Sequence, residues 1–177
     1  MTYPTNTAAK FINKALKEIG TVEEGDNLTK YGKSMGADGL PWCGSFVNWC
    51  AKQSGVGIHS VVSTAAGAEL FKKINRWSNI PRLGSLAFMD FPHDGVDRIS
   101  HLGIVVGLLP NNQVQTVEGN TSGTGGDQRN GGMVMLKVRN YGAGKEILGF
   151  GLPKFEEYNG EFPTIPNDTD KPKKGKK

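Results

Sequence analysis

Hydrophobic residues recur every three or four positions near the start of the chain. Six residues follow this spacing without a break: Ala8, Phe11, Ile12, Ala15, Leu16 and Ile19. The spacing places them on one face of a helix. Thr5, Asn6 or Thr7 can cap its start, and Gly20 ends it. The sequence therefore opens with an amphipathic helix.

Two more helices are predicted further along. Residues 21–41 have no periodicity and contain four glycines, which predicts a long loop with at most a short helical turn. Pro41 then favours the start of a second helix over residues 42–53, which Ser54 and Gly55 close. A third, shorter helix is predicted over residues 64–74.

After Pro81 the pattern changes to short apolar runs separated by turn-forming residues. The predicted strands cover residues 85–89, 101–108, 113–118, 133–139 and 147–152. Pro110, Asn111 and Asn112 form a hairpin turn between two of them, and residues 119–132 form a flexible loop. Helices followed by an antiparallel sheet predict an α+β fold.

The domain is predicted to cover residues 1–152, and residues 153–177 read as a proline-containing, lysine-rich linker or tail. Of the 177 residues, 37% are hydrophobic and 21% are charged, which is enough for a packed core. The net charge of +4 belongs to the tail, because without residues 167–177 the chain has 16 basic and 15 acidic side chains. Nucleic-acid binding by the domain is therefore not expected.

No signal peptide and no membrane-spanning run is found in the sequence, so neither export by the usual route nor membrane insertion is expected. A monomer is expected. Cys43 and Cys50 both fall on the second predicted helix, about 10 Å apart at ~1.5 Å rise per residue. A disulfide requires less than about 7 Å, so both thiols are predicted to be free.

Cys43 is the candidate nucleophile, because it stands on the first turn of a helix. There the free backbone N–H groups and the helix dipole favour the thiolate and can hold an oxyanion. The alternative interpretation is that Cys43 is only a small buried side chain near the start of a helix. Cys50 lies mid-helix among hydrophobic residues and is assigned to the core.

A nucleophilic thiol needs a base, and His101 is the best placed of the three histidines. It begins an apolar strand, whereas His59 and His93 lie in irregular connections. A core histidine is the alternative interpretation. Glu118 and Asn120 follow on the next strand and are both candidates for orienting the imidazole, because residues two apart on a strand face the same way.

These segments, in this order, resemble the CHAP family of cysteine- and histidine-dependent amidohydrolases and peptidases. The resemblance rests on Pro41-Trp42-Cys43, on Ser100-His101-Leu102-Gly103 and on Val117-Glu118-Gly119-Asn120, and covers residues 7–152. It implies a papain-like fold, with Cys43 as nucleophile, His101 as base, Glu118 as third member and Asn120 in a supporting or alternative orienting role.

The resemblance also implies a substrate, bacterial peptidoglycan, and a phage endolysin that stays in the host cytoplasm until its release to the cell wall. The bond cut is either N-acetylmuramoyl-L-alanine or one within the stem or bridge peptides. Trp42 and Tyr31 are candidates for lining a substrate groove. No cofactor or metal is expected; a calcium site would need the loosely spaced acidic residues Glu23, Glu24, Asp26 and Asp38.

Three alternatives stay open. The first is an inactive module of the same fold that binds wall peptides, and the second is a cytoplasmic amidase acting on a small molecule. The third is an interaction protein whose lysine tail docks on an anionic surface. His93, Asp94 and Asp97 resemble metal ligands, but a polar turn explains them equally well. Other hydrolase and nucleotide-binding motifs are absent from the sequence.

Overall fold

The computed structural model describes residues 2–167. Four helices, α1 (Ala8–Glu18), α2 (Lys30–Ser34), α3 (Cys43–Ser54) and α4 (Thr64–Lys73), precede the strands of the sheet along the chain. Thr7 caps α1 by accepting a hydrogen bond from the backbone N–H of Lys10. Gly55 ends α3 in the left-handed conformation. All three predicted helices are therefore confirmed, and α2 is the short turn within the predicted loop.

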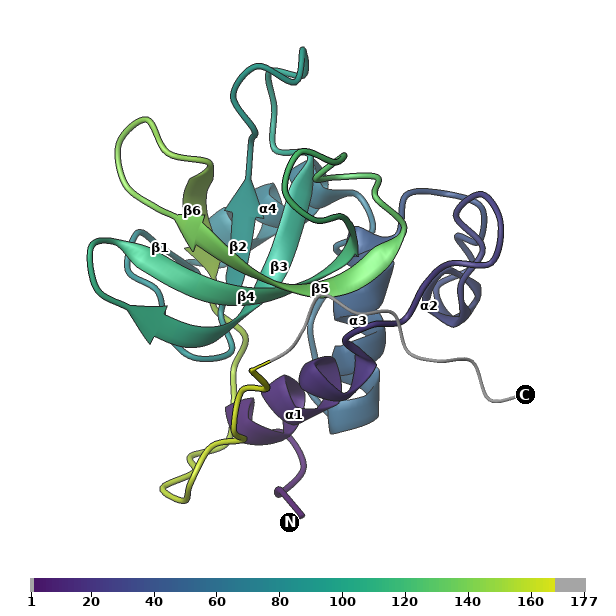
Figure 1. Ribbon diagram of the computed structural model, residues 1–177. Coiled ribbons are helices and arrows are strands. Elements are labelled where there is room, and N and C mark those ends of the chain that lie inside the picture. Colours follow the sequence, from purple (N-terminus) through teal and green to yellow (C-terminus); the bar gives the residue numbers. More distant parts are fainter. Residues whose placement is uncertain (1, 168–177) are drawn as a thin grey trace.

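The sheet has six strands: β1 (Trp77–Ser78), β2 (Leu86–Met89), β3 (His101–Leu109), β4 (Gln113–Thr121), β5 (Met133–Asn140) and β6 (Ile147–Gly151). Their order is β1-β6-β2-β3-β4-β5, and every neighbouring pair is antiparallel. Helices lie against one side of this curved sheet (Figure 1). The α+β class is confirmed, and the papain-like arrangement implied by the resemblance is compatible with it.

The predicted hairpin joins β3 to β4, with Asn111 and Asn112 both at positive φ as a tight hairpin turn requires. The sheet differs from the prediction at two places. The two-residue strand β1 was not predicted. β4 continues to Thr121 rather than ending at Glu118, and its register with β5 shifts between these two residues. Gly119 and Asn120 together stand opposite the single residue Val134 of β5, so the irregularity adds one residue to β4.

α3 is the central helix of the core. Phe46, Val47 and Cys50 are completely buried and share one cluster with strand residues Leu102 and Ile104. The opposite face of the sheet has a smaller cluster. It consists of Ala87, Met89, Val105, Val114, Ile147 and Phe150. Because side chains alternate along β3, His101 and Gly103 lie on the same face as Val105, away from Leu102 and Ile104.

The segment after Leu152 packs against the domain, so the predicted boundary at residue 152 is too early. Phe155 packs against Phe11 of α1 with ring centroids 5.8 Å apart, and the backbone N–H of Glu156 donates to the carbonyl oxygen of Asn6. In Figure 1 this yellow segment runs beside α1. The apolar residues of 153–165 therefore belong to the fold. The predicted lysine-rich tail lies mostly outside the described residues.

None of the helices within residues 2–167 is long and apolar enough to cross a membrane.

Candidate active site

Cys43 is the first residue of α3, and close packing holds this end of the helix against β4. A Cβ atom at Gly119 would lie 2.7 Å from Phe46 Cβ and 2.9 Å from Trp42, so only glycine allows this approach. Trp42 is the N-cap and makes no side-chain capping bond. The first N–H groups of a helix have no intrahelical acceptor, so this helix start can donate to a developing oxyanion.

Gly44, the second residue of α3, packs tightly against the backbone of the segment that precedes α4. A side chain has no room there, because a Cβ atom at Gly44 would lie 2.0 Å from the carbonyl oxygen of Val61. Asn48 of α3 holds this segment in place through hydrogen bonds to the His59 carbonyl and the Val61 N–H. Gly44 therefore serves packing.

His101 is the first residue of β3, and its ring is completely buried. Nε2 lies 2.8 Å from Oε1 of Glu118, which is also completely buried. The other ring nitrogen, Nδ1, has no well-aligned hydrogen-bond partner among the described residues. The ring nevertheless interacts with the thiol of Cys43. The structure therefore brings together the predicted nucleophile, the predicted base and one of the two predicted orienting residues.

The charge of His101 depends on these two neighbours. Burial alone would lower the pKa of His101, because it disfavours the charged ring. The interactions with Cys43 and Glu118 outweigh burial and raise the pKa to about 9, from an ordinary value of 6.5. At neutral pH the ring is therefore an imidazolium whose Nε2–H donates to Glu118.

Arg139 of β5 completes the arrangement, and the sequence analysis did not identify it. Its Nη2 donates to Glu118 Oε1 at 2.7 Å and its Nε donates to Oε2 at 2.8 Å. Burial alone would raise the pKa of Glu118, but Arg139 and then His101 lower it well below its usual range. The carboxylate thus stays ionised. An arginine on a strand face was the only signal in the sequence, and that signal is not specific.

No hydrogen bond joins Asn120 to His101 within residues 2–167. Asn120 adopts a positive φ of 58° in the irregular part of β4, so the alternation that places Glu118 beside His101 does not extend to it. Its amide nitrogen donates to Asn27 and Asn130, and its amide oxygen accepts from the N–H of Gly132. Glu118 is thus the residue that orients the ring, and Asn120 holds the two flanking loops together.

Trp42 and Tyr31 do not line a groove. Both side chains are completely buried, and their rings stack with centroids 5.4 Å apart. Trp42 Nε1 donates to Glu23 and the Tyr31 hydroxyl donates to Glu18. These aromatic rings pack behind the start of α3, so the predicted substrate-binding role is corrected to a supporting one. Aromatic side chains fit both roles, and the sequence pattern did not separate them.

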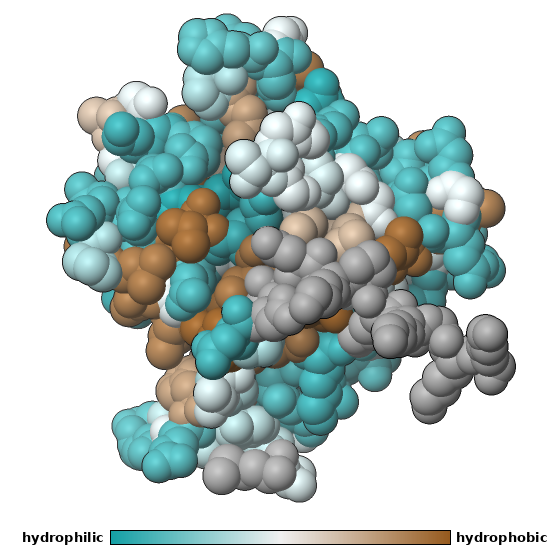
Figure 2. Space-filling view, viewed as in Figure 1, coloured by the Kyte–Doolittle hydropathy of each residue, from teal (hydrophilic) through white to brown (hydrophobic). Residues whose placement is uncertain are grey.

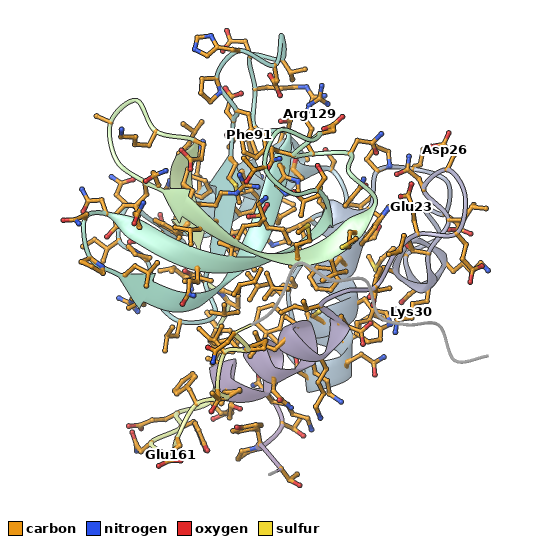
Figure 3. The ribbon with its side chains drawn as sticks, in the orientation of Figure 1. Glu23, Asp26, Lys30, Phe91, Arg129 and Glu161 are labelled. Carbon is orange, nitrogen blue, oxygen red and sulfur yellow. The ribbon has the colours of Figure 1, made fainter. Side chains whose placement is uncertain are left out.

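A cleft of about 640 Å³ adjoins this network. Its lining comes from the β2–β3 connection, from the β4–β5 loop and from Glu146. Phe91 belongs to this lining, and its ring packs against His101 at 5.6 Å between centroids. Arg129 and Asp94 form an ion pair of 3.0 Å that joins the two loops. Figure 3 shows Phe91 and Arg129 at the same end of the sheet. Figure 2 shows hydrophilic residues over the β2–β3 connection at the top of the view and residues of intermediate hydropathy over the β4–β5 loop.

The remaining histidines and the second cysteine lie outside the site. His59 Nε2 lies 3.0 Å from the Gly67 carbonyl oxygen, and its ring packs on Phe71. His93 lies in the loop that lines the cleft. Burial raises the pKa of the Cys50 thiol well above its usual value, which favours an inert thiol. Cys50 therefore matches its predicted assignment to the core.

Two of the four acidic residues considered for calcium accept hydrogen bonds within the protein. Glu23 accepts the Trp42 hydrogen bond, and Asp38 accepts one from the backbone N–H of Thr29. Figure 3 shows Glu23 and Asp26 in the region of α2. Within residues 2–167, no group of three or more histidine, cysteine or acidic side chains is placed to hold a metal ion. No catalytic step is assigned to a metal.

Gly103 makes the position of Glu118 possible. A Cβ atom at Gly103 would lie 2.5 Å from Glu118 Cγ, because the glutamate side chain crosses β3 at this point. We expect Gly103→Ala to displace Glu118 and to lower the activity more than about tenfold, since ~1 Å misplacements in active sites have large effects. Gly57→Ala is the matched control, because its Cβ atom would contact nothing. Equal activity of the two variants would contradict this role of Gly103.

The comparison with known families agrees with this geometry. Residues 35–120 match the family model of the CHAP domain. The match includes Cys43, His101, Glu118 and Asn120, and it ends before Arg139. No curated protein matches the chain. CHAP domains are commonly cysteine- and histidine-dependent amidohydrolases or peptidases with functions related to peptidoglycan.

Proposed function

Because residues 35–120 place this chain in the CHAP family, we propose that it is a peptidoglycan hydrolase that cuts an amide bond with Cys43 as its nucleophile. The observation that carries the proposal is the buried hydrogen bond between His101 and Glu118, beside a thiol at a helix start. This arrangement supplies a nucleophile, a proton carrier and a group that orients the carrier.

The reaction begins with His101 and Cys43 as an imidazolium–thiolate pair. The thiolate attacks the amide carbonyl carbon, and backbone N–H groups at the start of α3 stabilise the oxyanion. His101 gives its proton to the departing amine, and a thioester to Cys43 forms as the C–N bond breaks. Water, with His101 now acting as base, then hydrolyses the thioester and releases the new carboxylate. Glu118 keeps Nε2 engaged throughout.

The cleft beside Phe91 is the proposed route by which the peptide portion of the substrate reaches this site. Phe91 connects the cleft to His101, and the charged residues Asp94 and Arg129 are available to polar peptide groups. We assign the protein to the endolysin type, held in the host cytoplasm until its release to the wall, with peptidoglycan as its partner and no cofactor. The intact set of Cys43, His101 and Glu118 favours this function over an inactive binding module.

Digestion of purified peptidoglycan tests the proposal. We expect wild-type protein to release soluble fragments, whose masses and new amino termini identify the bond. Free stem peptides that begin with alanine would identify an N-acetylmuramoyl-L-alanine amidase, and new termini within the peptides would identify an endopeptidase. If the protein binds peptidoglycan but releases no fragments, the proposed function is wrong and the binding module takes its place.

The activity should fall as the pH rises through about 9, where His101 loses the proton that the departing amine needs. The same group links stability to pH. Its pKa in the folded protein lies above the ordinary 6.5, so its contribution to stability is complete below about pH 6.5 and is lost as the pH rises through about 9. Profiles of kcat/KM and of denaturant unfolding against pH check both expectations. Undiminished kcat/KM at pH 10 would contradict the assignment.

A further inference from the structure

Arg139 is a buried cation that the family match does not cover. It lies on β5, and only 7% of its surface is exposed. Burying a charged group costs free energy unless the group is paired with an opposite charge and its N–H groups are hydrogen-bonded. Here the guanidinium group is surrounded by partners: it donates to both oxygens of Glu118 and to Gln128 Oε1, and it lies 4.9 Å from the centre of the Phe91 ring.

Four donors determine how the Glu118 carboxylate is oriented. Oε1 accepts from His101 Nε2 and from Arg139 Nη2, at 2.8 and 2.7 Å. Oε2 accepts from Thr116 Oγ1 and from Arg139 Nε, at 2.5 and 2.8 Å. The planar guanidinium forms two parallel bonds with the carboxylate, which fix the plane of the carboxylate as well as its charge. Without them, Glu118 would keep only one donor on each oxygen.

We propose that Arg139 is a positioning residue, which acts through Glu118 to hold His101 oriented and charged for catalysis. This inference rests on the proposed function. Arg139 touches neither Cys43 nor the ring of His101 in any hydrogen bond within the described residues. It joins three parts of the protein: the sheet, the Phe91 wall of the cleft and, through Gln128, the β4–β5 loop.

The charged groups around Glu118 come from each element that packs on it. His101 faces it from β3 and Arg139 from β5, and Cys43 of α3 interacts with the His101 ring. Glu146 adds a more distant negative charge near Arg139. Arg139 is thus the cation that remains beside Glu118 at every protonation state of His101. Removing it should make Glu118 easier to protonate.

Two substitutions separate the charge of Arg139 from its geometry. Arg139→Met removes both, and we expect kcat to fall about 10- to 100-fold, the loss seen when partners that orient metal-binding side chains are removed. The acidic limb of the kcat/KM profile should also move up by about one to three pH units, the effect of removing a neighbouring cation from a carboxylate. Arg139→Lys keeps the charge but not the two parallel bonds. It should leave the limb in place and lower kcat with little change in KM.

The titration of Glu118 gives a readout that does not depend on hydrolysis. The ¹³C resonance of the Glu118 carboxyl, in full-length protein with labelled glutamate, should change at higher pH in Arg139→Met than in wild type. Arg76→Met is the matched control. Arg76 donates to the backbone carbonyls of Leu152 and Pro153, so its loss should lower stability without moving the titration of Glu118.

The outcomes separate the inference from the proposed function. If wild-type protein does not cut peptidoglycan but the Glu118 titration moves in Arg139→Met, the function is wrong and the action of Arg139 on Glu118 stands. If wild-type protein cuts peptidoglycan and Arg139→Met keeps its kcat and pH profile, the inference is overturned. If Arg139→Met does not fold, Arg139→Lys decides, because wild-type kcat in that variant would also overturn it.

Discussion

Cys43→Ala should lower the rate of peptidoglycan hydrolysis about 10⁶-fold, the scale of loss when a catalytic serine nucleophile is removed from a protease. No other described residue supplies a thiol at this position, since Cys50 is completely buried in the core. The initial rate of soluble fragment release measures this loss. The fold should survive, because the substitution removes a single buried sulfur atom.

Cys50→Ala is the matched control for this prediction. It removes the same atom from the same helix, two turns further on, and we expect it to lower stability modestly and to leave the rate within a few fold. Thermal unfolding of both variants separates the effects on stability and rate. Equal rates of fragment release by Cys43→Ala and wild-type protein would show that Cys43 is not the nucleophile.

Glu118→Gln should impair both stability and activity. The substitution leaves two cationic side chains, Arg139 and His101, buried around a neutral amide. Breaking a buried ion pair on one side costs about 3–5 kcal/mol, because the remaining charge is uncompensated. The rate should fall about 10⁴-fold, as when the carboxylate of a Ser-His-Asp triad is neutralised.

Denaturant unfolding and the rate of fragment release measure the two effects of Glu118→Gln. Glu69→Gln is the control, since Glu69 pairs with Lys72 on the exposed surface of α4. Its effect on stability should stay within about 0.5 kcal/mol. If Glu118→Gln behaves like Glu69→Gln, the buried network contributes neither to folding nor to catalysis.

Most of the fold, together with Cys43 and His101 of the candidate site, could be predicted from local sequence patterns. Helical periodicity predicted α1, α3 and α4, and apolar runs predicted five of the six strands. Cys43 and His101 could be identified because each begins a regular element, where neighbouring residues fix its direction. The expected hairpin, which pairs β3 with β4 antiparallel, made both Glu118 and Asn120 candidates, and the structure places Glu118 at the His101 ring.

The errors arose where tertiary contacts decide the outcome. Asn120 was expected to share the direction of Glu118, but the irregularity in β4 and its positive φ turn it towards Asn27 and Asn130. Trp42 and Tyr31 have residue types suited to a groove, but their burial depends on the packing of α2 against α3. Arg139 is far from Glu118 in sequence, and no local pattern connects the two.

Alkylation of Cys43 shows whether this one thiol carries the proposed cleavage of peptidoglycan. Folded wild-type protein is treated with iodoacetamide for increasing times, the modified cysteine is identified by mass spectrometry, and fragment release is measured on the same samples. We expect activity to fall in proportion to modification of Cys43, while Cys50 stays unmodified. Full activity after complete modification of Cys43, or no fragment release by the untreated protein, would contradict it.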